Sequence, residues 1–238
     1  MAIQTTGGAD RHLYTVSANF LSSTSPYSIT VWINAVWNGG ARLSFVGMYD
    51  GNITSGITTG LQIGTGAGAG EVTCWTYGGA SLVASSNGSM TPFNNTWVMI
   101  TYTYDGVTHS LYRNDVLLNS STVSQIPGIF TQIYINGYPP TGTASETATY
   151  QLDCYSYYSR TLSQPEIQTI YASRGNRHAI TFGQIACYDF DEQPAGATTT
   201  DVIDLSGNGN TMINTGAGTP ITYTYTNTVA SSNLRAVQ

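Results

Sequence analysis

Residues 94–118 read NNTWVMITYTYDGVTHSLYRNDVLL, and this stretch decides the class of fold. Its first part alternates between apolar or aromatic and polar side chains, the period-two pattern of a strand with one buried face. The alternating residues are Val98, Ile100, Tyr102 and Tyr104. An Asp-Gly pair (105–106) and an Asn-Asp pair (114–115) are turn dipeptides that separate this strand from two more, over 108–114 and 116–119. The stretch therefore predicts three consecutive antiparallel strands.

The same pattern recurs on both sides of this stretch. It predicts further strands over 27–34, 42–49, 71–77, 131–137 and 149–158. A single helix is expected over 162–175, because Ser163 and Glu166 have capping-box spacing and Gly175 can end the helix. One short helix among many strands predicts an all-β sandwich on which the helix acts as a structural plug.

The composition excludes several classes of protein. Only 8% of the 238 residues are charged, there is no lysine, and the formal net charge is −6. A chain with seven cations, all arginine, lacks the basic surface that nucleic-acid binding needs. Without lysine it has no Walker-type phosphate loop, and no apolar run is long enough for membrane insertion. Its 27 aromatic residues also argue against disorder.

Two motifs resemble a known family. The Trp-led strand that ends in Tyr-Asp-Gly is one, and the segment 150–172, with Asp153, Arg160 and Tyr171, is the other. Together with Trp32 in an early strand, they resemble laminin G-like domains of the concanavalin A-like lectin/glucanase superfamily. The resemblance covers most of residues 10–172, and it implies a jelly-roll β-sandwich with one short helix.

The last part of the chain departs from the family pattern. The segment CYDFDE (187–192) and the turn DLSGNGN (204–210) resemble the opening strand and loop of the family, yet here they come last. We therefore expect a laminin G-like β-sandwich over 1–175 and a circularly permuted C-terminal segment over 176–238. That segment would supply strands to the same sandwich or to a neighbouring one.

The acidic residues do not form the catalytic motif of related glucanases. Those enzymes carry Glu-x-Asp-x-x-Glu on one strand, where two carboxylates share a face for retaining hydrolysis. None of the four glutamates lies in such a motif; they are Glu71, Glu146, Glu166 and Glu192. We expect a protein that is not an enzyme.

A calcium site is the one cofactor that the sequence suggests. Asp189, Asp191 and Asp204 lie in a turn-rich acidic segment, and Ca²⁺ takes six to eight oxygen ligands. The resemblance points the same way, because laminin G-like domains often bind Ca²⁺ at loop ends. The alternative, which we favour, is that Asp204, Ser206 and Asn208 hydrogen-bond within their own turn.

A sugar site would combine an aromatic platform with polar side chains, since sugars have apolar faces and hydroxyl edges. Trp75, Tyr77 and Tyr138 lie at expected strand ends or in loops and form the candidate glycan-binding set. Alternatively, each of these residues belongs to the core or to a subunit interface.

The low charge favours a surface that is covered by neighbouring subunits. The lysine-free composition, rich in Ser, Thr, Asn and Gly, is similar to that of bacteriophage virion surface proteins. We therefore expect a structural protein on the virion surface, in a capsid decoration, fibre or spike. Its partners would be other virion proteins and copies of itself. A carbohydrate-binding adsorption lectin for host surface glycans is the alternative, and a secreted Ca²⁺-dependent adhesive lectin is a third class.

Overall fold

The stretch that begins at Trp97 forms three consecutive antiparallel strands, as its alternation predicts. They are β9 (Trp97–Tyr104), β10 (His109–Arg113) and β11 (Val116–Ser121). The computed structural model describes residues 2–6, 12–15, 20–35, 43–50, 58–63, 70–76, 81–85, 88–124, 128–135, 149–174, 176, 179–190, 198–199, 201–214 and 221–224.

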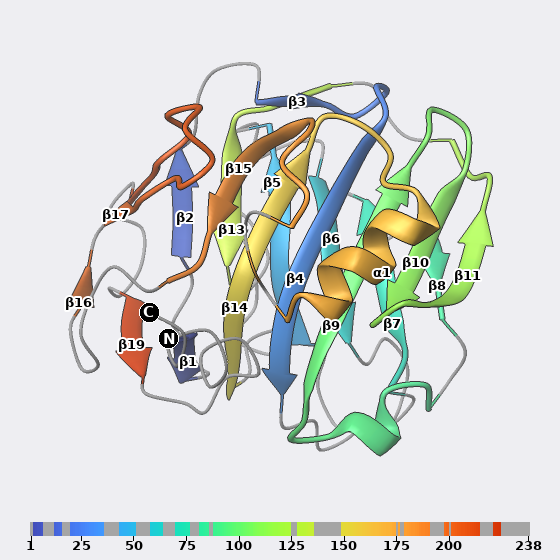
Figure 1. Cartoon of the computed structure of the whole chain (residues 1–238), viewed down its shortest axis with the longest axis horizontal. Helices are drawn as coiled ribbons and strands as arrows, with labels where there is room; N and C mark the ends of the chain where they lie inside the picture. Colours follow the sequence, from blue (N-terminus) through green and yellow to red (C-terminus); the bar gives the residue numbers. More distant parts are fainter. Residues whose placement is uncertain are drawn as a thin grey trace.

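The described strands form two large antiparallel sheets, which we call the front sheet and the back sheet (Figure 1). The front sheet has the order β11-β10-β9-β4-β14-β1-β19-β16, with β15 also paired to β14. Its remaining strands are β4 (Tyr27–Ala35), β14 (Thr149–Tyr158), β1 (Ala2–Thr6), β19 (Ile221–Thr224), β16 (Thr198–Thr199) and β15 (Gln184–Tyr188).

The back sheet has the order β17-β18-β2-β13-β5-β6-β7-β8. Its strands are β17 (Asp201–Val202), β18 (Met212–Asn214), β2 (His12–Thr15), β13 (Gln132–Ile135), β5 (Leu43–Tyr49), β6 (Thr58–Ile63), β7 (Val72–Thr76) and β8 (Ser81–Ala84). A short pair joins β3 (Leu21–Ser22) to β12 (Ile129–Phe130), and a 3-10 turn, η1, covers Thr91–Phe93. No helix among the described residues is long and apolar enough to cross a membrane.

The C-terminal segment contributes strands to both sheets of its own chain. β15 pairs with β14 and β19 pairs with β1 in the front sheet, whereas β18 pairs with β2 in the back sheet. These pairings give the edge groups of β14, β1 and β2 backbone partners from residues 184–224.

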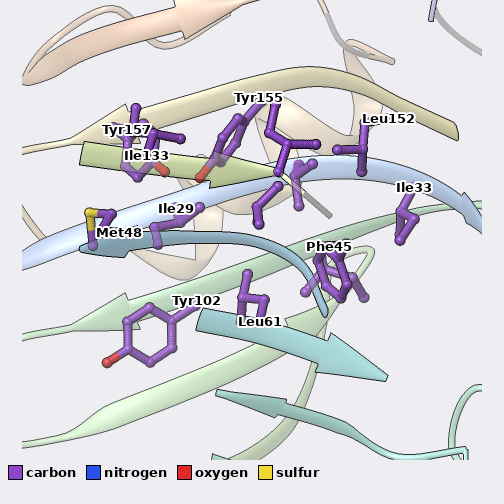
Figure 2. Close-up of a cluster of buried hydrophobic side chains, with 14 of the residues drawn as sticks. Ile29, Ile33, Phe45, Met48, Leu61, Tyr102, Ile133, Leu152, Tyr155 and Tyr157 are labelled. Carbon is purple, nitrogen blue, oxygen red and sulfur yellow. The ribbon is translucent and has the colours of Figure 1, made fainter. Parts of the chain in front are cut away.

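The main core lies between the two sheets, and Figure 2 shows part of it. Residues that the alternation assigns to the inner face of β9 are all buried, from Val98 to Tyr104. Each fully buried side chain of this size stabilises the fold by about 1.5–3 kcal/mol. The core residues labelled in Figure 2 are Ile29, Ile33, Phe45, Met48, Leu61, Tyr102, Ile133, Leu152, Tyr155 and Tyr157.

The helix α1 (Gln164–Ala172) lies on the outer face of the front sheet, across β4 and β9 (Figure 1). Ile167 and Ile170 are buried there in a second apolar cluster with Trp32, Met99 and Tyr158. Because α1 covers one face of β4 and the back sheet covers the other, every residue of β4 except Asn34 is buried.

The helix is shorter than the sequence predicts. Ser163 is the N-cap, and the capping box with Glu166 is present as expected. At the other end, however, Ser173 is the C-cap, and Arg174 takes the left-handed conformation (φ 53°) that glycine usually provides. The expected C-cap Gly175 lies outside the described residues.

Candidate functional site

The turn that carries the expected calcium ligand Asp204 is held by hydrogen bonds of its own. Oδ1 accepts from the N–H groups of Cys187 (3.0 Å) and Ser206 (2.9 Å). Oδ2 accepts from the N–H of Asn210 (2.8 Å) and from the Ser206 hydroxyl (2.9 Å). These four bonds account for the burial of the carboxylate. They show the turn-stabilising role that we weighed against metal binding.

Of the other two expected calcium ligands, the structure describes only Asp189. Asp189 is buried just after β15, two residues beyond Cys187, and Asp191 lies outside the described residues. Within the part of the chain that the structure describes, no group of three or more His, Cys, Asp or Glu side chains is arranged to hold a metal ion. Calcium binding by Asp189, Asp191 and Asp204 stays a prediction.

One of the three candidate glycan-binding residues, Trp75, is buried and not exposed as a sugar platform would be. This residue lies within β7 of the back sheet and is only 4% exposed, so its indole offers no open face for stacking on a sugar. A period-two pattern gives the face of a strand but not what covers that face, which is why the sequence suggested a platform here. Tyr77 and Tyr138 lie outside the described residues.

An aromatic residue and two amides meet instead on the outer face of the front sheet. Trp97 of β9 pairs with Asn34 of β4, and Asn34 pairs in turn with Gln151 of β14. Directly paired residues of neighbouring antiparallel strands project from the same face. All three side chains are partly exposed, unlike their neighbours in sequence Val98, Ile33 and Leu152, which face the core. We call Trp97, Asn34 and Gln151 the amide row.

The helix borders the amide row on one side. Tyr171, near the C-terminal end of α1, stacks on Trp32 with ring centroids 5.7 Å apart and planes inclined by 17°. Trp32 is two residues before Asn34 on the same face of β4, so Tyr171 stands beside the row. Figure 1 shows that β4 continues beyond the C-terminal end of α1. Trp97 also packs against the cluster under the helix, yet it stays partly exposed, as do Asn34 and Gln151.

This face of the sheet also has unused hydrogen-bonding capacity. Trp32 Nε1 and Asn34 Oδ1 are buried atoms without a hydrogen-bond partner among the described residues, and so is the hydroxyl of Thr101. A buried polar group left unpaired costs about 1–3 kcal/mol. These atoms are covered by the protein itself, and the polar groups open to a ligand on this face are the partly exposed parts of the Asn34 and Gln151 amides.

A salt bridge fixes the position of α1, and therefore of Tyr171. The Arg160 guanidinium donates to Glu166 Oε2 (2.9 Å) and Oε1 (2.6 Å) in a bidentate pair. Together with donation from the Ser163 N–H and hydroxyl (both 2.8 Å), this pair lowers the pKa of Glu166 to about 2. Glu166 is thus an ionised structural residue at neutral pH.

Two groups of the cluster beneath α1 titrate at unusually high pH. Burial is the main reason that the pKa of the Cys154 thiol lies well above its usual value, and nearby Asp153 raises it further. Burial also raises the pKa of the Tyr158 hydroxyl. Both groups stay protonated at neutral pH, so the chemistry that this face supports is hydrogen bonding and ring stacking.

Asp153 lies in the next row, opposite Trp32, and is 2% exposed. Its Oδ1 accepts from the N–H of Cys154 (2.9 Å), as expected for a buried hydrogen-bonding residue. Cys154 is in the left-handed region (φ 47°) at a β-bulge between β14 and β4.

The amide row was not identified from the sequence. Alternation does place Trp97 and Asn34 opposite the core-facing Val98 and Ile33, so their exposure could have been anticipated. Their alignment with Gln151 depends on the register between β4 and β14, which sequence periodicity does not specify.

Comparison with known proteins agrees with this fold. A family model described as the concanavalin A-like lectin/glucanases superfamily matches residues 7–168. No curated protein matches the sequence.

Solved structures with a similar fold come from distant proteins. A Bacteroides ovatus "putative carbohydrate binding protein" is 14% identical with a TM-score of 0.58; the match covers 89% of this chain and 58% of that one. A heptameric pentraxin from Limulus polyphemus is 10% identical with a TM-score of 0.58, covering 89% and 94%. A Trypanosoma rangeli sialidase is 13% identical with a TM-score of 0.55, covering 74% and 28%. Because the family model covers residues 7–168, more than half of the chain, the protein belongs to the concanavalin A-like lectin/glucanase superfamily.

Proposed function

We propose that the protein is a non-enzymatic carbohydrate-binding module and that the amide row is its glycan-binding surface. The observation that carries this proposal is the alignment of Trp97, Asn34 and Gln151 on three adjacent strands, partly exposed and beside Tyr171. An indole can stack on the apolar face of a pyranose, and two amides can both donate to and accept from its hydroxyl groups.

The relatives support a carbohydrate ligand through the fold they share with this chain. The Bacteroides ovatus neighbour is named for carbohydrate binding, and the Trypanosoma rangeli sialidase was solved with sialic acid. Because a fold does not specify a function, the ligand class is inferred from the chemistry of the amide row.

The setting that we propose is the surface of a bacteriophage virion. There the module would be part of a decoration, fibre or spike built from copies of itself and other virion proteins. The composition supports this, because a surface with 8% charged residues and no lysine suits burial between subunits. The pentraxin neighbour is a heptamer, so this sandwich is compatible with a ring of subunits. Several copies on one particle would raise a weak affinity per site through avidity.

A glycan array tests the proposal directly. The purified chain is screened with Ca²⁺ and again with a chelator, beside Trp97→Ala and Asn34→Ala. Phe182→Ala is the aromatic control, because Phe182 is 79% exposed and lies before β15, which pairs with the end of β14 opposite Gln151. The Phe182 ring contacts the Arg160 guanidinium, so the melting temperature of this variant is measured as well. Circular dichroism verifies that each variant is folded.

We expect specific glycans to bind the wild type and Phe182→Ala, and to lose most of their signal with the two row variants. A blank array for the folded wild type would refute carbohydrate binding. Binding that is unaffected by both row variants would place the site elsewhere. Loss of binding with chelator would instead support the calcium ligands Asp189, Asp191 and Asp204.

A further inference from the structure

We infer that the amide row accepts an uncharged, linear glycan that lies across the strands of the front sheet and contacts the protein through at least two sugar units. This inference rests on the proposed carbohydrate-binding function and deepens it by specifying the charge, shape and direction of the ligand.

The direction follows from the register. Trp97, Asn34 and Gln151 lie on β9, β4 and β14, so the row runs perpendicular to the strands. Neighbouring strands are about 4.8 Å apart, and the row therefore extends about 10 Å across two strand spacings. That length exceeds one pyranose ring, so a monosaccharide would reach only part of the row.

The borders of the row restrict the ligand to the same direction. On one side α1 covers β4 as far as Trp32, on which Tyr171 stacks. On the other side β4 ends at Ala35, whose carbonyl accepts a hydrogen bond from the Asn95 N–H (2.8 Å) in the turn before β9. The free surface along β4 is thus short, whereas the sheet continues sideways through β14 and β1.

The charges around the row favour a neutral ligand. None of the three side chains is ionisable, so the row itself offers no charged partner to a carboxylate or sulfate. Among the described residues, Arg174 is the nearest cation along the helix; it lies three residues beyond Tyr171 and is exposed, so solvent weakens its attraction for a bound anion. The net charge of −6 further disfavours anionic glycans.

The polar atoms of the face match hydroxyl groups, which donate and accept hydrogen bonds equally well. The amides of Asn34 and Gln151 are partly exposed, and each carries N–H donors beside an oxygen acceptor. A neutral sugar offers both roles on adjacent hydroxyl groups, whereas a carboxylate can only accept.

The test extends the glycan array to a length series. The strongest linear hit is titrated by calorimetry as its mono-, di-, tri- and tetrasaccharide, at low and at physiological salt. Linear oligogalacturonates of the same lengths serve as acidic counterparts. Trp97→Ala and Gln151→Ala are compared with Phe182→Ala, since Trp97 and Gln151 lie at opposite ends of the row.

We expect the hit to be uncharged and its affinity to rise at least tenfold from the mono- to the trisaccharide, then to level off. Trp97→Ala and Gln151→Ala should each remove most of this gain, and oligogalacturonates should bind at least tenfold more weakly. An acidic hit, an affinity independent of length, or a gain kept in both row variants would overturn the inference while carbohydrate binding stands. No binding of any glycan by the folded protein would overturn the proposed function itself.

Discussion

Replacing Glu166 by Gln should weaken the fold in a pH-dependent way. The ion pair with Arg160 and the hydrogen bonds from Ser163 lower the pKa of Glu166 from 4.5 to about 2. One pKa unit corresponds to about 1.36 kcal/mol, so the full shift corresponds to about 3 kcal/mol of stability. The side chain is 27% exposed, and solvent screening reduces the expected loss to about 1–2 kcal/mol.

The sign of the pH dependence follows from the lowered pKa. The carboxylate stabilises the folded state fully above the unfolded-state value of 4.5, and the contribution is lost as pH falls toward the folded value of about 2. The free energy of unfolding, measured by urea denaturation at pH 7, 4, 3 and 2, should therefore differ between wild type and Glu166→Gln at pH 7. The difference should shrink steadily below pH 4.5.

Glu71→Gln is the matched control, because Glu71 is partly exposed just before β7 and accepts only a long hydrogen bond (3.5 Å) from Thr73 among the contacts described. We expect it to change the free energy of unfolding by less than about 0.5 kcal/mol at any pH. An equal loss for Glu166→Gln at pH 7 and pH 2 would refute the reasoning, because it would mean that shape and not charge holds α1.

Three further predictions concern buried polar groups and backbone conformation. Burial lowers the pKa of His109 below 6.5, so the free energy of unfolding of the wild type should fall as pH drops below about 6.5. His109→Gln should flatten this decline, which denaturation curves between pH 7.5 and 5 would measure. Asp204→Ala removes four hydrogen bonds and should lower the free energy of unfolding by about 2–4 kcal/mol. If added Ca²⁺ raises the melting temperature of the wild type but not of this variant, Asp204 is a metal ligand. Gly183 has φ 75°, and a Cβ at this position would lie 2.9 Å from Arg160 Cδ. Gly183→Ala should therefore lower the free energy of unfolding by more than about 1 kcal/mol. An unchanged melting temperature would contradict this account.

The four longest strands, β4, β5, β9 and β14, were predictable because alternation is a local property. The strand over 149–158 was predicted with its observed bounds, and the hairpin from Trp97 to Ser121 was predicted with its turns. Several shorter strands were missed, among them β1, β2, β6 and β8. The reason is clear for β6, because Thr58–Ile63 reads TTGLQI and contains a glycine and few apolar residues at alternate positions. Its pairing with β5 and β7 in the back sheet, and not its intrinsic propensity, makes it a strand.

The candidate site was less predictable than the fold. Trp75 looked like a platform because an aromatic residue near the end of a strand can be exposed, but other parts of the molecule bury it. Asn34 and Gln151 looked like ordinary polar positions, because nothing near either residue in the sequence indicates that they are paired.

The sequence by itself determined the sandwich class, the inward faces of β4 and β9, the capped helix and the family motifs. All of these depend on neighbours within a few residues, where periodicity and capping act. Only the tertiary structure decided which outward faces are covered and which side chains align across strands. The bulge at Cys154 shifts the register between β14 and β4, and α1 buries Trp32 while leaving Asn34 at the surface. Register and coverage are set by contacts between residues far apart in the sequence, such as Asn34 with Trp97 and Gln151, and for that reason the amide row exists only in the folded chain.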